Sequence, residues 1–186
     1  RAGSSSRRDP HRNGVPMTTR NLASARSGTR ARGTLLLTVV LLAAVDLAVK
    51  AWAGGALADG HSVNLGPIEL RLGFNAGMAF SLGARLPAGV VLATTGLTIT
   101  AVAVFAWSAT RTATRSTWLP LAVILAGAVA NLIDRASDGV VTDYLHTGWF
   151  PTFNLADVYI TGGAITLMVA ALTSGDRTEN PTAAEL

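Results

Sequence analysis

Residues 34–53 read TLLLTVVLLAAVDLAVKAWA, an apolar run in which only Asp46 and Lys50 carry charge. A helix of about 20 apolar residues is long enough to cross the hydrocarbon core of a bilayer. The four-residue spacing places the two charged side chains on one helix face, where they can form an ion pair. The stretch therefore predicts a membrane-spanning helix whose polar pair is either purely structural or part of the support of a site.

Three further apolar segments follow this first one. They cover about residues 88–107, 118–133 and 158–173. The whole chain is 49% hydrophobic and only 14% charged, with a mean hydropathy of +0.40. Soluble domains are about 25% charged. The sequence thus predicts a mainly α-helical membrane protein with four transmembrane helices.

Arginine placement predicts the topology. Residues 1–33 are arginine-rich, contain the single acid Asp9 and have few apolar residues, so we expect a disordered basic tail. An apolar segment follows it directly, which favours a cytoplasmic flank over a nucleic-acid-binding arm. Arg111 and Arg115 place their loop on the same side. We therefore expect both termini in the cytoplasm and the 55–87 and 134–157 loops on the outer face, with a second tail at 175–186.

The chain start also has two features. Met17 is a candidate translation start. No A-x-A-like site ends the first apolar run and further spans follow it, so we expect a permanent helix there and not a cleaved signal peptide.

The first outer loop has a strand-like pattern. Its residues 61–74, HSVNLGPIELRLGF, alternate apolar and other side chains on both sides of Gly66-Pro67. Period-two alternation around a Gly-Pro turn indicates two short strands. We expect a small β-sheet on the outer membrane surface.

The second outer loop concentrates the acids. Residues 131–157 read NLIDRASDGVVTDYLHTGWFPTFNLAD. Asn154 and Asp157 have the spacing of a helix-capping box that also suits the helix dipole, and this explains Asn154 well. Asp134-Arg135 is first a charge pair ending the third helix, and Asp138 beside Gly139 is a turn. Asp143 is left without a local explanation.

Other chemistries have few residues available. The chain has no cysteine, three histidines and no HExxH motif, so we expect no metal site and no cofactor. Ser81 has no nearby His or Lys in a hydrolase pattern. Paired carboxylates remain as the candidate catalytic groups. Two close aspartates can divide their roles between an ionised base and a protonated acid.

Four sequence blocks together resemble the bacterial lipoprotein signal peptidase (signal peptidase II) family across about residues 34–173. The blocks are Asp46-x-x-x-Lys50, Asn75-Ala-Gly77-Met-Ala-Phe-Ser81, Asn131-x-x-Asp134-Arg135 with Gly139-x-x-x-Asp143-Tyr144, and Phe153-Asn154-x-Ala156-Asp157. They resemble the family patterns D-Q-x-x-K, N-x-G-A-A-F-S, N-x-x-D-R with G-x-V-x-D-F, and F-N-x-A-D. Leu47 stands where the family usually has Gln, and Ala replaces Gly around Gly127.

The resemblance implies an aspartic endopeptidase of the bacterial inner membrane. It would remove signal peptides from prolipoproteins before a diacylglyceryl-modified cysteine, near the outer face and without a cofactor. The resemblance implies roles as follows: catalytic Asp143 and Asp157; positioning Asn131, Arg135 and Asn154; supporting Asp134; site-lining or substrate-contacting Asp46, Lys50, Asn75 and Gly77. We expect a monomer whose partners are prolipoproteins and membrane lipids, with no nucleic acid.

Two other function classes stay open on the residues alone. A small proton- or cation-coupled carrier would use membrane-buried acids near the middle of its spans. A scaffold or assembly factor would tolerate replacement of both aspartates.

Overall fold

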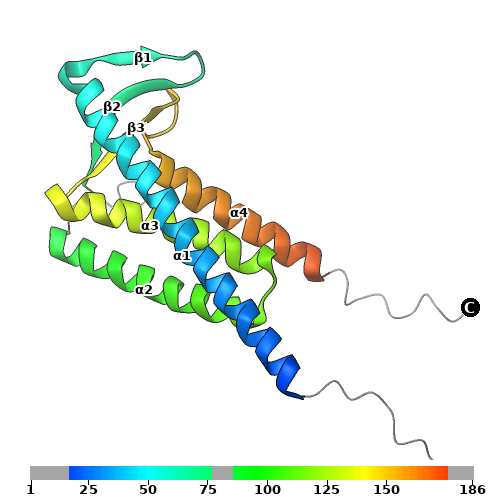
Figure 1. The fold of residues 1–186 in the computed structure, drawn as a ribbon. Coiled ribbons are helices and arrows are strands. Elements are labelled where there is room, and N and C mark those ends of the chain that lie inside the picture. Colours follow the sequence, from blue (N-terminus) through cyan, green and yellow to red (C-terminus); the bar gives the residue numbers. More distant parts are fainter. Residues whose placement is uncertain (1–16, 77–85, 176–186) are drawn as a thin grey trace, which may run out of the picture.

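Four long helices and one small sheet form the fold (Figure 1). The structure, a computed structural model, describes residues 17–76 and 86–175. The helices are α1 (Met17–Ala56), α2 (Ala88–Thr112), α3 (Arg115–Asp138) and α4 (Leu155–Gly175), and a short 3-10 helix, η1 (Ala58–Gly60), follows α1. This architecture confirms the predicted mainly α-helical fold with four spans and a small sheet.

Each of the four long helices contains a segment long and apolar enough to cross a membrane. These segments are Gly28–Ala56, Gly89–Thr112, Arg115–Asp138 and Leu155–Thr173. Large apolar side chains such as Leu97, Phe105 and Leu172 are more than half exposed on the outside of the bundle. Such a surface suits lipid and not water. The chain is thus a multi-pass membrane protein.

α1 extends further toward the N-terminus than the sequence predicted. The helix begins at Met17, within the segment expected to be a disordered tail up to residue 33. Arginine and alanine, which are frequent in residues 20–32, have high helix propensity, so the helix continues outward from the span. Residues 1–16 and 176–186 of the two predicted tails lie outside the described residues.

α3 is the most buried span and contacts the other three helices. Small residues allow its close approach to α4. A Cβ atom added at Gly127 would overlap the carbonyl oxygen of Ala156, and one added at Gly163 would lie 2.9 Å from the Pro120 carbonyl oxygen. The two backbones therefore lie closer than larger side chains permit. This contact sets Asn131, one turn beyond Gly127, beside the first turn of α4.

The sheet lies at one end of the helix bundle (Figure 1), opposite the start of α1 and the end of α4. Its antiparallel order is β1 (Ser62–Asn64), β2 (Glu69–Asn75) and β3 (Val141–His146). The β1–β2 turn is closed by the Leu65 N–H, which donates to the Ile68 carbonyl at 2.9 Å. The predicted hairpin around Gly66-Pro67 is confirmed, and Gly66 has the positive φ of 94° that glycine adopts readily.

The third strand was not predicted, because its sequence VTDYLH lacks a clear alternation and contains an aspartate, which strands disfavour. It pairs with β2, which is distant in sequence, and its residues Tyr144 and Leu145 also hydrogen-bond the backbone of Phe153. Gly73 pairs with Asp143, and the register shifts between Leu70 and Gly73. Such an irregularity bends a strand locally. The pairing shows that both predicted outer loops meet at the same end of the bundle.

Candidate active site

The predicted site residues gather in one polar cluster between the sheet and the helices. Its described members are Asp46 and Lys50 of α1, Asn75 of β2, Asn131, Asp134 and Arg135 of α3, Asp143 of β3, and Asn154 and Asp157 at the start of α4. Five of them, Asp46, Lys50, Arg135, Asp143 and Asn154, are at most 5% exposed. Gly77 and Ser81 lie outside the described residues.

Asn154 joins the two candidate aspartates. Its side-chain Nδ2 donates to Asp143 Oδ1 at 2.7 Å, and its backbone N–H donates to Asp157 Oδ2 at 3.2 Å. Its Oδ1 accepts from the Asp157 backbone N–H at 3.0 Å. The predicted capping box is therefore confirmed, but the same asparagine also reaches β3. A local helix cap thus fixes Asp143 and Asp157 relative to each other.

Lys50 supplies the cation of the cluster. Its Nζ lies 3.0 Å from Asp46 Oδ2 and 3.3 Å from Asp134 Oδ2, and it donates to the side-chain oxygen of Asn131. The predicted ion pair with Asp46 is confirmed. Asn131 then donates from Nδ2 to Asp157 Oδ1 at 3.0 Å. A continuous path of polar contacts therefore leads from Lys50 to Asp157.

Three side chains satisfy the first backbone N–H groups of α4, which have no partner within the helix. The Leu155 N–H donates to the hydroxyl of Tyr144, the Ala156 N–H to Asp46 Oδ1, and the Asp157 N–H to Asn154. The helix start is thus held from α1 and β3 as well as by its own cap. The sequence offered no local signal for the Tyr144 contact, because it depends on the fold.

Asp134 ties α3 to the beginning of β3. Its Oδ2 accepts from the Thr142 N–H at 2.7 Å, and its Oδ1 accepts from the Thr142 hydroxyl at 3.4 Å. The Asp134 carboxylate is therefore bound to the strand residue that directly precedes Asp143. The predicted turn at Asp138 is also present, since the Val140 N–H donates to Asp138 Oδ1 and Gly139 has a φ of 89°.

Arg135 holds β2 from the other side. Its Nη2 donates to the Asn75 carbonyl at 3.3 Å, so the end of α3 and the end of β2 are connected. The Asn75 side chain in turn hydrogen-bonds Asp143. Asp143 is therefore held by Asn75 of β2 and Asn154 of α4, and Arg135 of α3 in turn holds β2.

The surroundings of Asp143 favour its protonated form. Burial and then the negative charge of Asp157 raise the pKa of Asp143 from 3.8 to about 7. Hydrogen bonds from Asn154 and Asn75 and the charge of Lys50 oppose this rise. Near neutral pH the carboxyl of Asp143 therefore exists in both protonation states, as a group that exchanges protons must.

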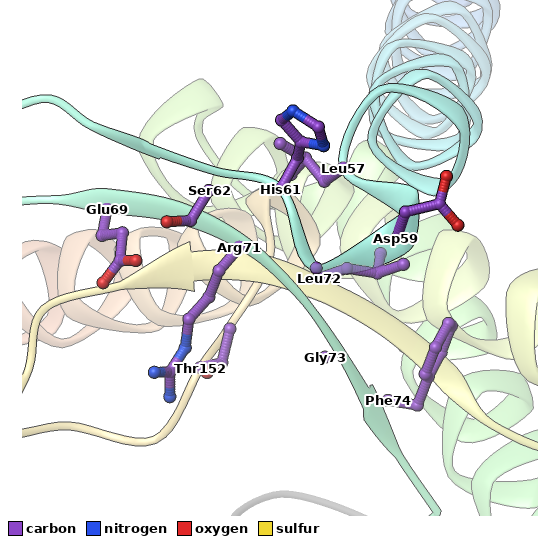
Figure 2. A pocket seen from close by; sticks show the side chains of 11 residues that line it. Leu57, Asp59, His61, Ser62, Glu69, Arg71, Leu72, Gly73, Phe74 and Thr152 are labelled. Atoms are coloured by element: carbon purple, nitrogen blue, oxygen red, sulfur yellow. The ribbon is translucent and has the colours of Figure 1, made fainter.

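A groove of about 540 Å³ lies next to the cluster, along η1, β1 and β2. Figure 2 shows Glu69, Arg71 and Gly73 in succession along one of its strands, with Thr152 also lining it. Its charged side chains are of both signs, and Asp143 and Asp157 do not line it. The buried cluster, and not the groove, therefore holds the candidate catalytic groups.

Comparison with known proteins decides the family. The profile of the family described as Signal peptidase (SPase) II matches residues 38–173. This chain belongs to the signal peptidase II family. The match covers the second part of α1, from residue 38, together with α2, α3, the whole sheet and most of α4, so the family resemblance drawn from the four sequence blocks is confirmed.

Relatives named lipoprotein signal peptidase support the same family. The protein of Syntrophomonas wolfei is 34% identical over 151 residues, 79% of this chain and 95% of that one, and the Mycobacterium tuberculosis protein is 33% identical over 146 residues, 74% and 70%. The Dehalococcoides mccartyi protein is 51% identical, but over only 71 residues, 36% of this chain. The chain spans 44% of the length of that relative.

The fold of this signal peptidase II family member also occurs in solved structures. A structure described as a bacterial membrane enzyme has a TM-score of 0.68 at 23% identity, covering 83% of this chain and 94% of that one. A second of the same description has a TM-score of 0.63 and covers 75% and 93%. At this identity the likeness concerns the fold alone.

Proposed function

We propose that this chain is an aspartyl endopeptidase that removes the signal peptide from prolipoproteins, cutting before a diacylglyceryl-modified cysteine. Family membership supports the reaction class, and the relatives described above carry the name lipoprotein signal peptidase. The observation that carries the proposal is that Asn154 donates hydrogen bonds to both Asp143 and Asp157 inside a buried cluster.

We assign the base to Asp157 and the acid to Asp143. Asp157 accepts N–H groups from Asn131 and Asn154 and lies in the first turn of α4, where the helix dipole favours negative charge. Asp143 is buried beside that charge, which raises its pKa to about 7. Two neighbouring carboxylates resist being ionised together, so one proton is divided between them.

In this assignment the ionised Asp157 takes a proton from water, and the water oxygen attacks the scissile carbonyl. The protonated Asp143 donates a hydrogen bond and then its proton to the carbonyl oxygen as it becomes negative. The tetrahedral intermediate then collapses: Asp143 takes back the hydroxyl proton, the C–N bond breaks, and Asp157 gives the proton it took from water to the leaving amine of the cysteine. Both carboxyls return to their starting states, so water supplies all the atoms added in this hydrolysis.

The other cluster residues hold the pair in place. Lys50 offsets the negative charge and orients Asn131, whereas Asp46 and Asp134 hold α4 and β3. Arg135 secures the end of β2, where Asn75 begins the segment that leads to Gly77. We propose that Asn75 and Gly77 contact the substrate.

We further propose that the peptidase unit is residues 34–174, a monomer in the bacterial inner membrane, flanked by cytoplasmic segments 1–33 and 175–186. Arg111 and Arg115 connect α2 to α3 at the end opposite the aspartates, and positive residues favour the cytoplasmic side. The chain has no cysteine, so Asp59→Cys and Arg111→Cys provide single reporters. A membrane-impermeant thiol reagent added to intact cells should label the first and not the second; the reverse pattern contradicts this topology.

The function is tested by incubating the purified chain with one prolipoprotein prepared with and without its diacylglyceryl group. We expect cleavage of the lipid-modified form only, immediately before the cysteine. Equal cleavage of both forms would remove the lipid requirement. No cleavage of either, combined with ion transport in vesicles, would favour the carrier class.

A further inference from the structure

The end of the bundle opposite the aspartates contains a second feature, where α1 meets α2. The guanidinium of Arg32 lies over the ring of Trp107, with its central carbon 4.7 Å from the ring centre. This is the geometry of a cation–π contact between two different helices. The indole ring therefore fixes the plane of the guanidinium.

Arg32 has donors without acceptors. Its Nε and Nη2 are enclosed and have no hydrogen-bond partner within the part of the chain that the structure describes. An enclosed donor without an acceptor costs free energy, and more so when it is charged. Trp107 offers a π-face but no lone pair, so the contact with the ring leaves this requirement unmet.

The described helices also lack an anion at this end. Arginines gather here: Arg30 and Arg32 on α1, Arg111 at the end of α2 and Arg115 at the start of α3. Within the four described spans, every acid lies in the half of its span nearer the sheet. These acids are Asp46, Asp134, Asp138 and Asp157. Arg30, Arg111 and Arg115 are exposed, whereas the enclosed donors of Arg32 need an acceptor from outside the described part of the chain.

The depth of the site indicates which anion is available. Arg32 lies four residues inside the beginning of the first span, and Trp107 five residues before the end of the second. Tryptophan concentrates at the level of lipid headgroups. Arg111, one turn beyond Trp107 on the same face of α2, adds a second guanidinium at that level.

We propose that Arg32, Trp107 and Arg111 form a binding site for the phosphate of an anionic phospholipid, between α1 and α2. The planar guanidinium of Arg32 matches a phosphate group with paired donors, which a lysine could not do equally well. Trp107 holds that guanidinium in place while its partly exposed ring contacts the upper acyl chain. The site is separate from the aspartate cluster and does not depend on the proposed peptidase activity.

Native mass spectrometry of the detergent-solubilised chain, titrated with phosphatidylglycerol, tests the site. We expect Arg32→Gln to raise the dissociation constant for phosphatidylglycerol about tenfold, since a charge-assisted contact is lost. Arg32→Lys and Trp107→Leu should each raise this dissociation constant by a smaller but measurable factor. The matched control is Arg30→Gln, which removes the same charge two residues away and should change affinity less than about twofold.

Three results would overturn the site. Equal losses in the Arg30 and Arg32 variants would show diffuse attraction between charges in place of a site. Unchanged affinity in Arg32→Gln, with a wild-type thermal unfolding curve, would exclude Arg32. Displacement of the lipid by millimolar inorganic phosphate would show that free phosphate is the ligand, whereas zwitterionic phosphatidylcholine should compete weakly and inorganic phosphate not at all.

Discussion

Replacing Asn154 separates helix capping from the coupling of the two aspartates. Asn154→Ala removes the cap of α4 and the bond to Asp143. Loss of the cap costs about 1 kcal/mol and loss of a bond to a charged acceptor about 1.5–3 kcal/mol, so we expect about 3 kcal/mol of destabilisation. Asn154→Ser retains a good capping oxygen but is too short to bridge to Asp143, so it loses only the second part.

The sign of the effect on catalysis follows from the same bond. The Asn154 amide favours the ionised form of Asp143, so its loss raises the pKa of Asp143 further above 3.8. A loss of about 1.5 kcal/mol corresponds to about a tenfold change in the protonation equilibrium of Asp143, in the direction that raises its pKa. Asp143 acts as the protonated acid, so the alkaline limb of the rate profile should move to higher pH by about one unit.

The assay is kcat/KM against pH for the wild type, Asn154→Ser and Asn154→Ala, using lipid-modified prolipoprotein in lipid nanodiscs. Thermal unfolding of each variant gives the loss of stability independently. We expect both variants to shift the alkaline limb, and only Asn154→Ala to lose the capping contribution. An unshifted limb in Asn154→Ser would refute the reasoning, because Asn154 would then act as a helix cap alone.

Lys50→Met should lower the unfolding temperature by roughly 10 °C in a thermal scan, because it leaves the buried Asp46 and the partly buried Asp134 without their cation; an unchanged temperature would contradict that pairing. Gly127→Ala should separate α3 from α4 and reduce cleavage, whereas Gly162→Ala, where an added Cβ meets nothing within 4 Å, should not; equal activities would argue against the close contact. Tyr144→Phe removes the acceptor of the Leu155 N–H and should cost about 1 kcal/mol. Hydrogen exchange at that amide should become faster, and an unchanged rate would exclude the bond.

Contacts between neighbours in sequence could be predicted. The Asp46–Lys50 pair and the Asn154–Asp157 capping box are spaced four and three residues apart, so helix geometry alone brings them together. The hairpin around Gly66-Pro67 was predictable for the same reason, because its alternation and its turn are adjacent.

Contacts between distant elements could not be predicted from spacing. Asp46 meets the backbone of Ala156, and Asn154 reaches Asp143 on a strand that the sequence did not predict. β3 is held by pairing with β2 and by backbone bonds to Phe153, and pairing between distant segments leaves no local pattern. The family resemblance selected Asp143 and Asp157 together, whereas the residues alone favoured a capped helix.

The helical start of α1 is a different case. Composition indicated disorder before residue 34, but the adjoining span provides a helix that is already formed. Extending an existing helix avoids the cost of nucleation, so a polar segment with good helix formers can continue it. Hydropathy locates the membrane core and gives no information on where such a helix begins.

The most direct test of the central claim is the cleavage rate of Asp143→Asn and Asp157→Asn, with Asp138→Asn as the matched control. All three replace an aspartate at the same end of the bundle, but Asp138 lies in a turn outside the cluster. We predict that the first two lose all detectable cleavage while unfolding cooperatively, and that Asp138→Asn cleaves at the wild-type rate. Wild-type cleavage by either of the first two variants would contradict the assignment of Asp143 and Asp157 as the catalytic pair.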